Sequence, residues 1–180
     1  LDPRFRYLRV TAGKQVAFLA LGYVYTDSHG PVEVWYSADR EVIRLQNGRL
    51  VGAAGTLTEW RQVRMPVLPA WRELAKTPGP YGWERIRDIM PGYQFNITDA
   101  LQVKRIAPPK QSRLLGVASE GYTWFEETLA AQPAAYGTAG NLPPARYAVE
   151  FVGDTERAVY AEQCLSTALC LTWQRWVAGQ

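Results

Sequence analysis

The sequence predicts an all-β fold: an antiparallel meander of about ten strands that closes as a barrel or barrel-like sandwich, with one short helix. Runs of roughly five to ten residues rich in Val, Tyr, Trp, Phe and Leu recur along the chain, and Gly, Pro, Asn and Asp interrupt them. Most connections between these runs are short enough for hairpins. So many antiparallel strands in 180 residues must close or fold back as two sheets.

Composition indicates one folded domain over residues 1–180. The chain is 47% hydrophobic and 12% aromatic, which supplies a core and argues against disorder. The longest apolar run, 16–25, is about half of the roughly 20 residues that a membrane helix needs. A formal charge of +3 with scattered Arg residues does not indicate nucleic-acid binding.

In the first third of the chain, three strands are separated by turn-forming residues. They are expected at 7–11, 15–25 and 32–37. The clearest hairpin follows in 41–55, where Asn47-Gly48 suits a type I′ turn and pairs Gln46 with Arg49. This register places Ile43, Leu45 and Leu50 on a buried face and Arg44, Gln46 and Arg49 on a solvent face.

The strand pattern lapses between 60 and 80, where residues 69–76 are expected to form two helical turns that end before Pro78. Four further strands are expected at 83–90, 93–106, 113–118 and 122–129. Residues 131–144 are the most loop-like stretch and the best place for a partner contact.

The last strands are expected at 147–152, 155–163 and 169–177. A two-residue turn at Gly153-Asp154 would set Glu150 opposite Arg157, although a four-residue turn also fits.

Cys164 and Cys170 are the only cysteines, and five residues separate them. The spacing suits a disulfide that closes a small hairpin loop, which favours an oxidising compartment. Two buried, reduced thiols in a cytosolic protein are the alternative. The spacing is not that of a zinc site, so we expect no metal.

The sequence does not predict an enzyme. His29 is the only histidine, and adjacent Asp27, Ser28 and His29 in a loop would not supply triad geometry. Glu126 and Glu127 are neighbours in a strand, so they point to opposite faces rather than flank one cleft. No glycine-rich phosphate loop is present, and we expect no cofactor.

The seven Trp and ten Tyr residues are mostly expected in the core. In a sharper interpretation, some of them line a groove where flat rings meet sugar faces and Arg residues meet acidic groups. Trp35 and Tyr36 are consecutive in a strand, so one ring faces inward and the other outward. The candidate ligand-binding residues are Trp35, Tyr36, Arg49 and Trp60.

Three stretches of the chain together resemble one family. They are Ala20-Leu21-Gly22-Tyr23 followed by Val34-Trp35-Tyr36-Ser37-Ala38-Asp39, then Gln46-Asn47-Gly48-Arg49-Leu50-Val51-Gly52 with Gly55, and Glu162-Gln163-Cys164 ahead of Leu171-Thr172-Trp173. They are similar, in the same order, to the YjbF/GfcB family of lipoproteins encoded with exopolysaccharide and group 4 capsule secretion genes. The Asn-Gly-Arg hairpin with the upstream Trp-Tyr-Ser-Ala segment is the most specific part.

The resemblance implies a barrel-like antiparallel β domain on the periplasmic face of the outer membrane. The lipid anchor would be an N-terminal cysteine ahead of Leu1, and the family continues beyond Gln180 with another strand-like segment. The expected partners are outer-membrane polysaccharide export proteins or the polysaccharide itself. The resemblance implies a non-enzymatic accessory role and carries over no catalytic residues. The alternatives are a carbohydrate-binding module with exposed aromatic residues, or a polysaccharide-modifying enzyme.

Overall fold

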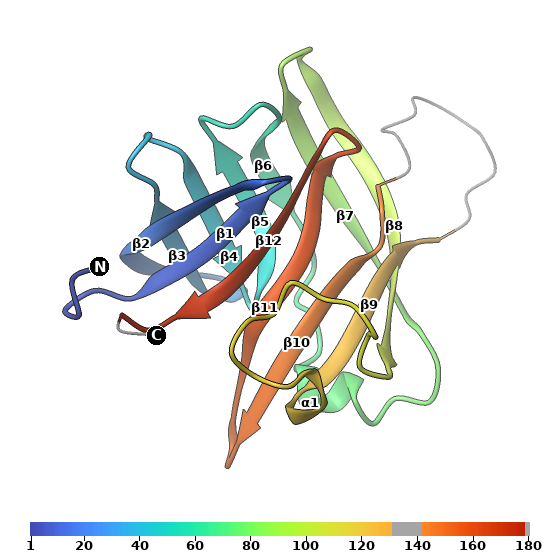
Figure 1. Ribbon diagram of the computed structural model, residues 1–180. Helices are drawn as coiled ribbons and strands as arrows, with labels where there is room; N and C mark the ends of the chain where they lie inside the picture. Colours follow the sequence, from blue (N-terminus) through green and yellow to red (C-terminus); the bar gives the residue numbers. More distant parts are fainter. Residues whose placement is uncertain (131–141, 179–180) are drawn as a thin grey trace.

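The computed structural model describes residues 1–130 and 142–178, and within them twelve antiparallel strands form one sheet that closes on itself (Figure 1). Each strand pairs with the next along the chain, and β1 pairs with β12 to complete the ring. The all-β class and the closed meander are confirmed. The strands are β1 (Tyr7–Ala12), β2 (Gln15–Asp27), β3 (Gly30–Tyr36), β4 (Val42–Gln46), β5 (Arg49–Ala54), β6 (Glu59–Arg64), β7 (Tyr81–Met90), β8 (Gln94–Ile106), β9 (Thr123–Leu129), β10 (Ala145–Val152), β11 (Thr155–Ser166) and β12 (Leu169–Trp176).

Two strand assignments made from the sequence are wrong. Strand β6 lies in the stretch where the pattern lapsed, because a register shift between Trp60 and Gln62 interrupts its alternation. The segment 113–118 forms no strand. Its backbone bonds to side chains instead: Arg113 N donates to the Tyr160 hydroxyl, and Leu115 N donates to Gln174 Oε1. The most loop-like stretch, 131–144, lies outside the described residues up to position 141.

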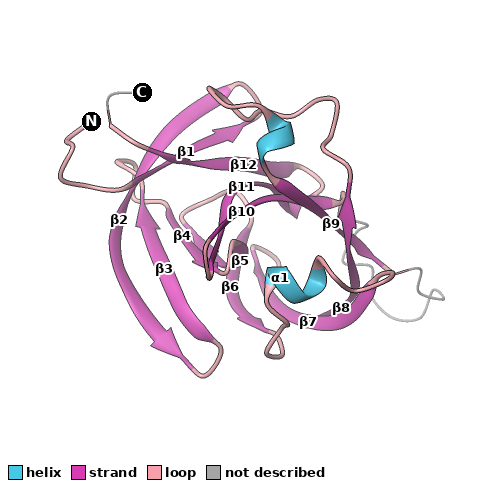
Figure 2. Ribbon diagram, turned by 90° about the horizontal axis from the view of Figure 1, so that it is seen from below, coloured by secondary structure: helices cyan, strands magenta, loops and turns pink. Residues whose placement is uncertain are grey.

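The short helix is present but spans one turn rather than two. Helix α1 (Trp71–Leu74) begins where the Trp71 and Arg72 amides donate to the two carboxylate oxygens of Glu156, at 2.7 and 2.9 Å. Trp71 and Leu74 are buried in the core, and α1 lies within the outline of the ring seen from below (Figure 2). The other helical segment is a 3₁₀ turn, Ser119–Gly121. No helix among residues 1–130 and 142–178 is both long and apolar enough to cross a membrane.

Both predicted hairpin registers are confirmed. Gln46 pairs with Arg49, and both turn residues, Asn47 and Gly48, have positive φ (48° and 82°), as a type I′ turn requires. Glu150 pairs with Arg157, and their side chains form a 2.9 Å ion pair.

The predicted solvent face of the first hairpin is wrong for Gln46 and Arg49, which are only 5% and 2% exposed. Gln46 donates to Asp27 Oδ1 and to the Gly30 carbonyl. Arg49 pairs with Glu127 of β9, in the interior of the ring. Protein partners therefore replace water for both side chains: Gln46 bonds to groups at the β2–β3 turn, and Arg49 bonds to a buried carboxylate on distant β9.

Tryptophan supplies five of the buried side chains of the main core cluster. Six of the seven Trp residues are buried, and Trp176 is half-buried; the six are Trp35, Trp60, Trp71, Trp83, Trp124 and Trp173. Trp124 belongs to a smaller cluster with Ala148, Val159 and Tyr160. The expectation that the Trp and Tyr residues mostly form core is confirmed for Trp but is wrong for Tyr, because only Tyr7, Tyr147 and Tyr160 are buried among the described tyrosines.

The disulfide between Cys164 and Cys170 is present, and it joins cross-strand partners of β11 and β12. The double variant Cys164→Ala/Cys170→Ala should lose about 2 kcal/mol of unfolding free energy, because the bridge restrains only a short loop in the unfolded chain. Urea unfolding of the oxidised protein and of the variant measures this difference. Equal midpoints would show that the bridge does not stabilise the fold.

Candidate functional site

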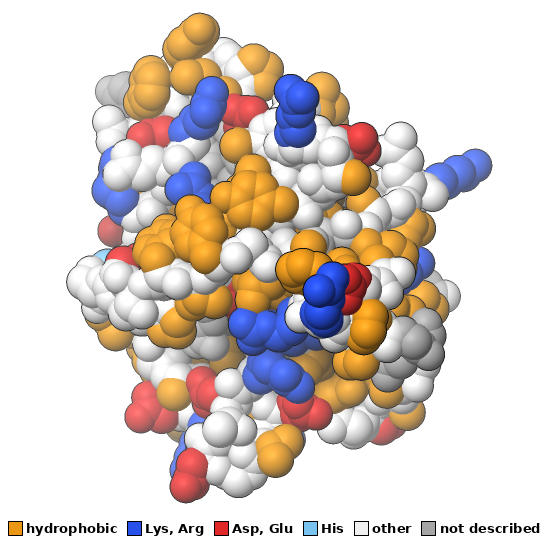
Figure 3. Space-filling view, turned by 90° about the vertical axis from the view of Figure 1, so that its left-hand side faces the viewer, with side chains coloured by type: hydrophobic (Ala, Val, Ile, Leu, Met, Phe, Trp, Pro, Cys, Tyr) orange, Lys and Arg blue, Asp and Glu red, His pale blue; other side chains and the backbone are white. Residues whose placement is uncertain are grey.

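Three exposed tyrosines form a row on the outer face of β2 and β3. Tyr23, Tyr25 and Tyr36 are 53%, 40% and 40% exposed. The ring centroid of Tyr23 lies 6.2 Å from that of Tyr25 and 6.4 Å from that of Tyr36. Figure 3 looks onto the side of the molecule where β2 and β3 lie, and shows hydrophobic side chains gathered at the surface with Lys and Arg beside them. We call these three side chains the tyrosine row.

A β-bulge creates this row. Strand β2 points Leu19 and Leu21 toward the core, so strict alternation would also turn Tyr23 and Tyr25 inward. The register shift between Leu21 and Tyr23 inserts Gly22 and reverses the alternation. Tyr23 and Tyr25 consequently share the outer face with Tyr36. Tyr23 is the cross-strand partner of Val34, and Tyr25 is that of Val32; both valines are buried.

Of the four predicted ligand-binding side chains, only Tyr36 is exposed. Trp35 and Trp60 are each 1% exposed and Arg49 is 2% exposed, which removes these three from any surface site. The predicted alternation is confirmed, since Trp35 faces the core and Tyr36 faces outward.

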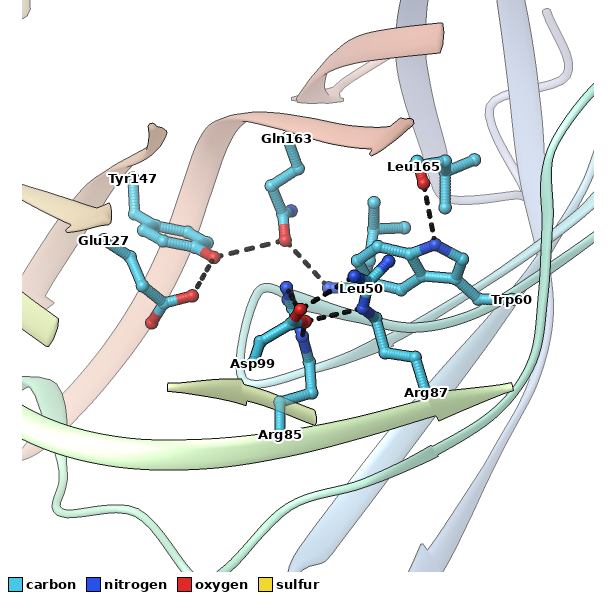
Figure 4. A network of polar contacts seen from close by, with 9 residues as sticks. All are labelled: Leu50, Trp60, Arg85, Arg87, Asp99, Glu127, Tyr147, Gln163 and Leu165. Atoms are coloured by element: carbon cyan, nitrogen blue, oxygen red, sulfur yellow. Dashed lines mark hydrogen bonds and ion pairs between the residues drawn. The ribbon is translucent and has the colours of Figure 1, made fainter. Parts of the chain in front are cut away.

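Arg49 lies instead in a buried polar network inside the ring. Its Nε donates to Glu127 Oε2 at 3.0 Å, and its guanidinium carbon lies 4.0 Å from the ring centroid of Trp71. The Tyr147 hydroxyl lies 3.1 Å from Glu127 Oε1 and 3.2 Å from Gln163 Oε1. Gln163 also binds the first hairpin: its Oε1 accepts from Leu50 N (Figure 4), and its Nε2 donates to the Gly48 carbonyl.

A second buried cluster adjoins the first. Asp99 accepts from Arg85 at 2.9 Å and from Arg87 at 2.5 and 2.8 Å. Both guanidinium groups lie over the ring of Trp60, whose Nε1 donates to the Leu165 carbonyl (Figure 4). Burial lowers the pKa of Arg87, while Asp99 opposes that shift.

Inside the ring, a tyrosine, an arginine and a carboxylate converge, which is the set that a polysaccharide lyase would need. Tyr147, Arg49 and Glu127 are 1%, 2% and 3% exposed, however. The cavity beside Glu127 has a volume of about 20 Å³, enough for roughly one water molecule. The arrangement therefore joins strands rather than receives a polymer.

Burial raises the pKa of Tyr147 well above its ordinary value, and the Glu127 charge adds to the shift. Burial and Glu162 likewise raise the pKa of Tyr160. Because only the folded chain resists ionisation of these hydroxyls, they should leave the free energy of unfolding unaffected below about pH 10 and lower it as the pH rises further.

Urea unfolding at pH 8 and pH 11 measures this decline, and tyrosine absorbance reports ionisation directly. Tyr160→Phe should make the decline shallower. A free energy of unfolding that is the same at both pH values would contradict the assignment.

The other candidate sites, a triad around His29 and a pair of catalytic carboxylates at Glu126 and Glu127, are not assembled. Ser28 Oγ lies 3.0 Å from His29 Nδ1, and Asp27 Oδ1 lies 3.8 Å from the same nitrogen, whereas a triad needs the two partners on opposite ring nitrogens. Glu126 and Glu127 point to opposite faces as predicted, because Glu126 pairs with Arg146 and Glu127 with Arg49. Residues 1–130 and 142–178 contain no group of three metal-ligating side chains.

Two adjoining grooves, of about 670 and 500 Å³, open between the β2–β3 and β10–β11 hairpins. Their shared charged residues are mostly paired. Arg175 contacts Glu33 and Arg157 contacts Glu150, each at 2.9 Å. These ion pairs leave little charge to select a ligand, so the tyrosine row is the stronger candidate site.

A family model and a solved structure are similar to this chain. The sequence model of a family described as "Group 4 capsule polysaccharide lipoprotein gfcB, YjbF" matches residues 5–136. Among solved structures, the hypothetical lipoprotein YmcC from Escherichia coli (K12) is similar, with a TM-score of 0.62 and 16% identity. That likeness covers 96% of this chain and 86% of the other, and it concerns the fold. No curated protein matches the chain.

Proposed function

Because this chain belongs to the family of group 4 capsule polysaccharide lipoproteins, we propose that it is a non-enzymatic accessory to capsule or exopolysaccharide export. It would act through contacts with the secretion machinery or with the polymer. The observation that carries the proposal is the family match over residues 5–136. The tyrosine row supports it, since it offers an exposed surface for such a contact.

The proposed location is the periplasmic face of the outer membrane, with a lipid anchor at the N-terminus. Membership of a lipoprotein family supports the anchor. The Cys164–Cys170 disulfide supports an oxidising compartment such as the periplasm.

Cross-linking in intact cells, followed by purification of the envelope fraction, tests the proposed role. The recovered material is probed for outer-membrane export proteins and for polysaccharide, and polymer export is measured after deletion of the gene. Loss of export on deletion, with recovery of an export protein or polymer, is the expected result. Unchanged export would contradict the proposal.

A carbohydrate-binding module is the second candidate, and the exposed tyrosines favour it. Buried tryptophans count against a Trp-based module, because six of the seven rings are unavailable for stacking on a glycan. Any such activity would therefore depend on tyrosine.

A further inference from the structure

Each ring of the tyrosine row presents an apolar face and a polar hydroxyl tip to the outside of the sheet. Adjacent rings are tilted by 38° and 41°. Because all three rings are exposed, together they form an open surface. The carbon-bound hydrogens of a sugar ring pack on such faces, while sugar hydroxyls bond to the tyrosine tips. A repeated row suits a ligand that is itself repetitive.

The absence of a side chain at Gly22 leaves room for the ring of Tyr36. A Cβ atom at Gly22 would lie 2.5 Å from Cε2 of the Tyr36 ring. Any larger residue at this position would therefore lift or turn the ring. The glycine that forms the bulge thus also sets the orientation of one member of the row.

Gly52 of β5 likewise leaves room for the side chain of Arg44, which extends from β4 on the same outer face. Gly52 is the cross-strand partner of Arg44, and a Cβ there would clash with the guanidinium group. The guanidinium is further held by a 3.0 Å hydrogen bond from Nη2 to the Arg61 carbonyl. The strands thus hold this cation in one place on the sheet.

Arg44 forms no ion pair with residues 1–130 and 142–178. Glu59 pairs with Arg61 at 2.9 Å, and Asp27 accepts from Gln46 and the His29 amide. Arg44 is the cross-strand partner of Val34, and Val34 pairs on its other side with Tyr23, so Arg44 extends from the same outer face as the row. An unpaired cation on the same face as the tyrosine row complements a ligand that carries carboxylates.

We infer that the outer face of β2–β5 binds an acidic polysaccharide strand: Tyr23, Tyr25 and Tyr36 stack on its sugar rings, and Arg44 pairs with a carboxylate. This inference rests on the proposed function, which supplies the polymer, and it adds that the polymer is acidic. A protein partner would use the same exposed rings, and the experiment below separates the two.

Affinity electrophoresis in native gels that contain polygalacturonate or neutral dextran tests the inference. Polygalacturonate should retard the protein more strongly than dextran. Tyr36→Ala and Gly22→Ala should each raise the dissociation constant for polygalacturonate at least tenfold, whereas Tyr36→Phe keeps the ring and should stay near the parent value. Arg44→Gln should abolish the preference for the acidic polymer.

Tyr93→Ala is the matched control, because Tyr93 is 75% exposed but lies at the β7–β8 turn. It should leave retardation unchanged, and circular dichroism of every variant verifies folding. No retardation by polygalacturonate, or retardation that Tyr36→Ala leaves intact, would overturn the inference. A Tyr36-dependent cross-link to an export protein without polymer binding would assign the face to a protein partner.

The two proposals fail separately. If deletion of the gene stops export while polygalacturonate is not retained, the accessory role stands and the glycan inference is wrong. If the polymer is retained while deletion leaves export unchanged, the accessory role is wrong instead.

Discussion

Asp99→Asn should lower the free energy of unfolding by about 3–5 kcal/mol, the cost of removing one partner from a buried ion pair. Asp99 is 3% exposed and is the only carboxylate within ion-pair distance of Arg85 and Arg87 among the described residues. The asparagine would keep the shape of the side chain but leave two neighbouring buried cations, both over the Trp60 ring, without a counter-ion. Urea unfolding at pH 7 measures the loss.

The exposed Asp154 offers a matched control, because it lies in the β10–β11 turn and forms no ion pair with the described residues. Asp154→Asn should change the unfolding free energy by less than about 0.5 kcal/mol. If Asp99→Asn were equally mild, the cluster would not contribute to stability as described.

Arg49→Met should lower the free energy of unfolding by a similar amount, about 3–5 kcal/mol. Here a buried anion, rather than a buried cation, loses its partner. The variant would leave the Glu127 carboxylate buried without its cation, and would remove the guanidinium stacked on Trp71. Methionine fills much of the space, so the loss reports on charge more than on volume. The readout is again urea unfolding.

A double-mutant cycle sharpens this prediction. Glu127→Gln combined with Arg49→Met should be less destabilising than the sum of the single variants, because neither charge is then left unpaired. Arg61→Met, on the exposed face of β6, should be nearly neutral. Additive effects of Arg49→Met and Glu127→Gln would show that the two side chains are not coupled.

The position of Arg49 shows where reading the sequence fails. The Asn47-Gly48 turn and its register were predictable, because a type I′ turn is a local property of two residues. The inward orientation of Arg49 depends on Glu127, which lies 78 residues away in the sequence. A local sequence pattern does not indicate whether a charged residue has a distant buried partner. Strand alternation alone therefore predicts a solvent-facing Arg49, which is wrong.

The tyrosine row was only partly predictable for a related reason. Alternation places Trp35 and Tyr36 on opposite faces of the sheet, which is correct, but it does not say which of the two rings is exposed. Tyr23 and Tyr25 were not identified as site residues, because a single inserted residue at Gly22 reverses their side of the sheet. A glycine in a long strand was the available signal, since such a residue often marks a bulge.

The pairing of β1 with β12 has a consequence for how the chain folds. Every other pairing of the ring joins neighbours along the chain, whereas this one joins the first strand to the last. A chain that crosses a membrane N-terminus first would present the outer edge of β1 unpaired until β12 arrives. Unpaired strand edges recruit other strands, so the interval before closure is the one in which misassembly and chaperone capture compete with folding.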